Sequence, residues 1–164
     1  INAGDKYGIT PYGTEAMHVL RAEKGYIIAG QETDGTTTPA DLGMDWAVSK
    51  KKDFIGRRSL SRPDTARGDR KQLVGLLTTD PTEVRPEGGQ ITAERHERPP
   101  MPMIGHVTSS YHSANLGRSI ALAVIKGGRA RHGDTVYIPL LDRTVTAEVT
   151  DPVFFDPDGS RLHA

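Results

Sequence analysis

Residues 119–125 read Ser-Ile-Ala-Leu-Ala-Val-Ile and residues 144–150 read Thr-Val-Thr-Ala-Glu-Val-Thr, and these two stretches decide the fold class. In the second stretch, apolar and polar residues alternate, which is typical of a strand with one buried face. In the first stretch, the run from 120 to 125 is continuously apolar and predicts a central strand covered on both faces. We therefore expect a core built from β-strands.

Further stretches around these two carry the same strand signals. The six predicted strands are 72–78, 89–93, 104–110, 119–125, 135–141 and 144–150. Turn formers such as Gly, Pro and Asp separate neighbouring strands. Six short antiparallel strands usually close into a small barrel or sandwich, because closure removes the exposed edges. We predict a small antiparallel six-stranded β-barrel.

The N-terminal part of the chain has a different, mixed pattern. Thr14 is a candidate helix N-cap, and Met17 and Leu20 lie three apart on one helical face. Thr38 followed by Pro39 predicts the start of a second, short helix. Residues 44–48 alternate between apolar and polar like a strand. We therefore expect a mixed α/β segment before the barrel, and an α+β fold class for the whole chain.

A basic connector separates the two parts. Residues 50–71 hold nine basic and three acidic side chains, and few apolar residues follow Leu60. We place the boundary near residue 66, which predicts a first domain over 1–66 and a barrel domain over 67–164.

Composition excludes several classes of function. The chain has 21 Lys and Arg, 21 Asp and Glu, and no Cys. This balance argues against a dedicated nucleic-acid binder, and the lack of Cys rules out disulfides and thiolate metal sites. No apolar run reaches the ~18 residues of a membrane span, and no phosphate loop or dinucleotide motif occurs.

Because the chain starts at Ile1 without a leader, we expect a piece of a longer cytoplasmic polypeptide. The histidines are too dispersed to predict a metal site: His18, His96, His106, His112, His132 and His163.

Several linked motifs point to a known family. They read Leu-Arg-Ala-Glu-Lys-Gly-Tyr (20–26), Asp-Gly-Thr-Thr-Thr-Pro (34–39), Leu-Gly-Met-Asp-Trp (42–46), Gly-His-Val-Thr-Ser (105–109) and Gly-Asp-Thr-Val (133–136). In this order they resemble the folate-binding aminomethyltransferase family, typified by the T-protein of the glycine cleavage system. Within that family, the sequence of these motifs is most similar to the C-terminal region of the alpha subunits of heterotetrameric sarcosine oxidases. The resemblance covers nearly the whole chain.

The resemblance implies a role in one-carbon chemistry. Such a subunit receives the imine formed when a flavin oxidises sarcosine, and tetrahydrofolate captures its carbon as 5,10-methylene-tetrahydrofolate. The implied partners are the other subunits of the heterotetramer. FAD, FMN and NAD are expected only in the complete enzyme and not on this chain. The catalytic aspartate of the family lies upstream of the matching motifs, so we expect no catalytic residue here and no activity from the chain alone.

The resemblance also implies a folate site made of Glu23, Tyr26 and Lys51. A Glu in the Arg-x-Glu-x-Gly context recognises the pterin, whose paired N–H donors suit a carboxylate. Tyr26 would line the same pocket. Lys51 stands where relatives carry an Arg, and would place a point charge on the glutamate tail. Simpler interpretations stay open: a surface Glu paired with Lys24 or Arg21, a buried strand Tyr, and a solvated basic patch.

Two alternative functions remain at this point. The nearest is an aminomethyltransferase or a dimethylglycine-oxidising relative, although the Asp-Gly-Thr-Thr-Thr-Pro motif favours sarcosine oxidase. The other is a non-catalytic module, in which the barrel serves subunit assembly.

Overall fold

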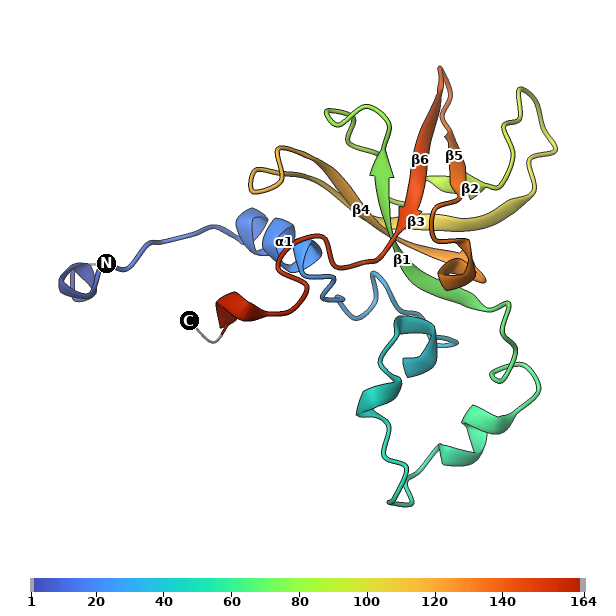
Figure 1. Ribbon diagram of the computed structural model, residues 1–164, viewed down its shortest axis with the longest axis horizontal. Coiled ribbons are helices and arrows are strands. Elements are labelled where there is room, and N and C mark those ends of the chain that lie inside the picture. Colours follow the sequence, from blue (N-terminus) through green and yellow to red (C-terminus); the bar gives the residue numbers. More distant parts are fainter. Residues whose placement is uncertain (1, 163–164) are drawn as a thin grey trace.

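The computed structural model describes residues 2–162 and places a ten-residue helix beside a closed β-barrel (Figure 1). Ile1, His163 and Ala164 lie outside the described residues. The helix α1 spans Thr14–Glu23. The strands are β1 Lys71–Thr78, β2 Gln90–Thr92, β3 Met103–Ser113, β4 Arg118–Lys126, β5 Thr135–Pro139 and β6 Thr144–Thr150. All six predicted strands form, and the predicted α+β class is confirmed.

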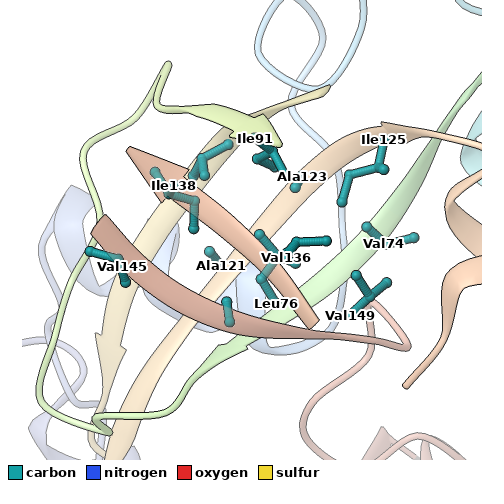
Figure 2. Packing of buried hydrophobic residues seen from close by; sticks show 12 residues of the cluster. Val74, Leu76, Ile91, Ala121, Ala123, Ile125, Val136, Ile138, Val145 and Val149 are labelled. Carbon is teal, nitrogen blue, oxygen red and sulfur yellow. The ribbon is translucent and has the colours of Figure 1, made fainter. Parts of the chain in front are cut away.

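The strands close in the order β1-β4-β3-β2-β5-β6, and every neighbouring pair is antiparallel. Side chains that alternate along each strand fill the interior with an apolar cluster (Figure 2). Its β4 members are Ala121, Ala123 and Ile125, and Val149 of β6 belongs to the same cluster. Because the sheet closes on itself, each of the six strands has a neighbouring strand on both sides.

Strand β4 is buried on both faces, as its continuous apolar run predicts. Its outward residues Ile120, Leu122 and Val124 form a second apolar cluster with Ala22 of α1. The burial of α1 is concentrated at its last turn. Met17 and Leu20, which mark the apolar face expected from the sequence, remain substantially exposed. Figure 1 shows the residues before α1 extending away from the barrel.

The segment between α1 and the barrel contains short 3-10 helices and no strand within residues 2–66. The strand expected over residues 44–48 is wrong: Asp45–Ala47 forms a 3-10 helix. Gly43 turns the backbone with a φ of 73° just before it. A short alternating run needs a sheet edge to pair with, and the closed barrel offers none. The predicted domain boundary near residue 66 stays a prediction.

The remaining helices are short 3-10 helices of three to five residues. They span Asp5–Tyr7, Pro39–Leu42, Asp45–Ala47, Arg57–Ser61, Gly128–Arg131 and Ser160–Leu162. The helix predicted after Thr38 is therefore present as a 3-10 turn. No helix within residues 2–162 combines the length and the apolar content that crossing a membrane requires.

The Asp-Gly-Thr-Thr-Thr-Pro motif holds its own turn together. Asp34 accepts hydrogen bonds from the backbone N–H and the hydroxyl of Thr36, and these bonds lower the pKa of Asp34 to about 2. Thr38 and Asp41 cap the following 3-10 helix reciprocally. Arg70 then joins Asp41 at 2.9 Å, next to the start of β1. The motif thus fixes this segment against the barrel.

Candidate functional site

The hollow that contains Tyr26 lies between the segment after α1 and the barrel, and we call it the aromatic hollow. It measures about 530 Å³. Tyr26 is 53% exposed and Trp46 is 83% exposed, so both rings leave surface free for a ligand. The lining residues are Gly25, Tyr26, Ile27, Leu42, Gly43, Met44, Trp46, Leu73, Arg129, His132, Asp151, Pro152 and Val153. Its size and mostly apolar lining suit a drug-sized organic ligand.

A second hollow of about 480 Å³ shares Trp46 with the first. We call it the basic hollow, because Lys50, Lys51 and Lys52 line it. The Ser49 hydroxyl accepts hydrogen bonds from the backbone N–H groups of Lys51 and Lys52, which orders this turn. Tyr26 and Lys51 therefore belong to adjoining hollows, with Trp46 as the common wall. The sequence motif contained Trp46, but nothing in it indicated this bridging position.

Glu23 lies elsewhere, in the contact between α1 and the barrel. It is only 2% exposed, and it lines neither hollow. One carboxylate oxygen accepts from the Ser113 hydroxyl at 2.6 Å and the other from the Asn115 amide at 2.8 Å. The interpretation of Glu23 as a surface partner of Lys24 or Arg21 is therefore wrong. Contact between Glu23 and a pterin stays a prediction.

Glu23→Gln is expected to destabilise the chain by about 1–3 kcal/mol, because one buried donor loses its charged acceptor. The amide that replaces one oxygen would face the Ser113 hydroxyl or the Asn115 amide group. Urea unfolding measures the loss, with Glu97→Gln on an exposed loop as the matched control. An unfolding midpoint equal to that of the control would show that these bonds contribute nothing.

A buried ion pair behind Tyr26 was not predicted from the sequence. Arg21 contacts Glu32 at 3.0 Å, and both side chains are almost fully buried. The Arg21 guanidinium also donates to the Ser109 hydroxyl at 2.6 Å. Glu32 in turn accepts from the backbone N–H of Ile28 at 2.7 Å. The pair thus joins α1, the segment after it, and the irregular stretch of β3 around Ser109.

The same arginine holds Tyr26 by its backbone. The Tyr26 N–H donates to the Arg21 carbonyl at 2.9 Å, and Arg21 Nη1 donates to the Tyr26 carbonyl at 3.2 Å. Arg21 therefore positions Tyr26 at the aromatic hollow. The only sequence feature that could have indicated this ion pair is the opposite charge of Arg21 and Glu32, eleven residues apart. Among residues 2–162, no group of three or more His, Asp or Glu side chains is arranged to bind a metal.

Comparison with known proteins identifies the family. The family model of the glycine cleavage T-protein C-terminal barrel domain matches residues 71–156, which span the closed barrel. The chain belongs to the glycine cleavage T-protein family. The model of the family's GCVT N-terminal domain matches residues 1–52. This range contains α1 and more than half of the residues that line the aromatic hollow.

Individual relatives agree with this family assignment. The sarcosine oxidase subunit alpha of Corynebacterium sp. (strain P-1) is 53% identical over 161 residues. That of Rhizobium meliloti (strain 1021) is 42% identical over 166 residues. These matches cover 97% and 99% of this chain but only 17% of either relative. The chain therefore spans about a sixth of the length of these two relatives.

A solved structure has the same fold. It is the glycine cleavage system aminomethyltransferase T from Bartonella henselae, with a TM-score of 0.72 and 22% sequence identity. The match covers 87% of this chain and 38% of that protein. At this identity the likeness concerns the fold alone.

Proposed function

We propose that this chain is the C-terminal part of a sarcosine oxidase alpha subunit, and that it forms one wall of a tetrahydrofolate site. In the complete enzyme this site would convert the sarcosine-derived imine and tetrahydrofolate into 5,10-methylene-tetrahydrofolate. The identity to sarcosine oxidase alpha subunits over nearly the whole chain supports the first part. The junction of the aromatic and basic hollows at Trp46 carries the second.

The chemistry of the two hollows fits a reduced folate. A folate has flat rings at one end and carboxylates at the other. Tyr26 and Trp46 offer ring faces on which a flat ring can stack. Lys50, Lys51 and Lys52 offer positive charge for the carboxylates. Arg129 and His132 add polar groups to the mainly apolar lining of the aromatic hollow.

These residues would bind and orient rather than catalyse. Tetrahydrofolate supplies the amine that captures the one-carbon unit. The imine carbon is already electrophilic, so the protein mainly has to hold the amine close to it and manage protons. We propose that the proton-handling aspartate lies in a preceding part of the complete subunit. On this proposal the chain alone does not turn over sarcosine, and FAD, FMN and NAD bind elsewhere in the heterotetramer.

Glu23 could bind a pterin only after a local rearrangement. To accept hydrogen bonds from a pterin, its carboxylate would have to be released by Ser113 or Asn115. In the complete subunit, equal folate affinity of the wild type and Glu23→Gln would remove Glu23 from the site. A lower affinity of Glu23→Gln, measured at a temperature where both proteins are fully folded, would support a direct contact.

Titration of tetrahydrofolate into the complete subunit tests the proposed site. Lys51→Gln is expected to weaken binding several-fold at low ionic strength, and added salt should narrow the difference because it screens the exposed charge. Lys6→Gln, which removes a lysine outside both hollows, is the control. Equal affinity of Lys51→Gln and Lys6→Gln at low salt would contradict the role of the basic hollow.

A further inference from the structure

The stretch from residue 2 to residue 20 is poorly covered by the rest of the chain. None of these residues is buried, whereas residues 21–23 in the last turn of α1 are. The Tyr7 N–H donates to the Gly4 carbonyl at 2.8 Å, and the Met17 N–H donates to the Gly13 carbonyl at 3.4 Å, so both bonds stay within the stretch. Figure 1 shows the residues before α1 leading away from the barrel. The stretch is therefore joined to the barrel mainly through the last turn of α1.

Large apolar side chains are concentrated on this stretch. Thirteen of them are exposed within residues 2–162, and five of the thirteen lie within residues 7–20. Met17 and Leu20 share one face of α1, opposite to Ala22, which packs on the outer apolar cluster of the barrel. A helix with apolar side chains on opposite faces is normally covered on both. We call the five residues the N-terminal apolar surface: Tyr7, Ile9, Tyr12, Met17 and Leu20.

The segment that carries this surface has no core of its own. Within residues 2–66, Ala22 is the single buried apolar residue, and it packs against the barrel rather than within the segment. A protein domain normally buries its apolar residues in a core of its own. The model of the GCVT N-terminal domain matches residues 1–52, a range separate from the barrel match over 71–156. A core for this segment is therefore to be sought outside residues 2–162.

We propose that the N-terminal apolar surface docks onto the preceding part of the complete subunit. This inference rests on the proposed function, in which the chain is the C-terminal part of a sarcosine oxidase alpha subunit. The matches cover only 17% of either alpha subunit, which leaves most of such a subunit outside this chain. The surface also lies on the stretch through which the preceding part would join the barrel. Docking covers the second apolar face of α1.

Docking also steadies one wall of the proposed folate site. Arg21 directly follows Leu20 in α1, and Arg21 Nη1 donates to the Tyr26 carbonyl at 3.2 Å. A preceding part that packs on Leu20 therefore fixes the helix that positions Tyr26 at the aromatic hollow.

Oxidation of methionines by hydrogen peroxide tests the proposal, because the reaction requires access to the thioether. Met17 is 44% exposed, and Met103 on β3 is 54% exposed. Peptide mass spectrometry measures both rates in the 164-residue chain and in the complete alpha subunit, with N-acetylmethionine as an internal standard. Met17 is expected to oxidise at least tenfold more slowly in the complete subunit. Met103, which lies outside the N-terminal apolar surface, is the control, and its rate should change less than twofold.

Leu20→Asp places a charge in the docked surface. In the complete subunit it is expected to return Met17 oxidation to within about threefold of the rate in the 164-residue chain. In the 164-residue chain itself, the same substitution should move the unfolding midpoint by no more than about 2 °C, because Leu20 has little to pack against there. Leu141→Asp is the matched control: it changes a fully exposed leucine in the turn between β5 and β6 and should leave Met17 protected.

The proposal is overturned if Met17 oxidises as fast in the complete alpha subunit as in the 164-residue chain. It is also overturned if protection appears only after the other subunits are added, since one of them would then cover the surface. Titration with tetrahydrofolate separates this inference from the proposed function. Protection of Met17 without folate binding refutes the folate site alone, and folate binding with unprotected Met17 refutes the docking surface alone.

Discussion

Arg21→Met is expected to destabilise the 164-residue chain by about 3–5 kcal/mol, the cost of breaking a buried ion pair by removing one partner. Glu32 would remain buried, with the Ser109 hydroxyl and the Ile28 N–H as its partners but without a cation. The backbone of Tyr26 would also lose the bond from Arg21 Nη1. Urea unfolding at pH 7 measures the loss of stability.

The matched control is Arg57→Met. Arg57 pairs with Asp53 at 2.7 Å, but both side chains are largely exposed, so the loss should stay below about 1 kcal/mol. The double variant Arg21→Met with Glu32→Met should recover part of the stability, since it leaves no unpaired charge inside. If Arg21→Met costs no more than Arg57→Met, the pair does not hold the helix to the barrel.

Gly105→Ala is expected to destabilise the chain by about 3 kcal/mol or more, since overpacking at a rigid site forces the backbone to move. A Cβ atom at this position would lie 2.1 Å from the Val124 carbonyl oxygen and 2.9 Å from the Ile125 Cα. Both atoms belong to the backbone of β4, which is paired with β3. They cannot move aside unless the ladder between these two strands opens.

Gly68→Ala serves as the control for Gly105→Ala. A Cβ atom at Gly68 meets nothing within 4 Å, so its effect should stay within about 0.5 kcal/mol. Thermal unfolding of the two variants gives the comparison. A Gly105→Ala midpoint equal to that of Gly68→Ala would mean that β3 and β4 are farther apart than described.

The sequence predicted the barrel well because its signals are local. The alternation of apolar and polar residues predicted strand β6 with the bounds that it has in the structure. The continuous apolar run in β4 correctly predicted that this strand is buried on both faces. Residues 44–48 show the limit of such signals. Alternation is present there, but a strand also needs a partner, and the availability of a sheet edge depends on the whole topology.

The site was less predictable, because distant residues decide the burial of its charged groups. Glu23 receives its hydrogen bonds from Ser113 and Asn115, some 90 positions further along the chain. Arg85, in the loop after β1, is likewise buried by residues far along the chain, since it bonds to Ser110 of β3 and Ser119 of β4. The family resemblance suggested Tyr26 and Lys51, and the structure places them in adjoining hollows that share Trp46.

The central claim is that the aromatic hollow binds tetrahydrofolate, and calorimetric titration of the complete subunit tests it most directly. The wild type should bind saturably, and Tyr26→Ala should weaken binding at least tenfold while the unfolding midpoint stays within a few degrees. Tyr12→Ala, which removes an exposed tyrosine outside the hollow, should bind like the wild type. Equal affinity of Tyr26→Ala and the wild type would contradict the account.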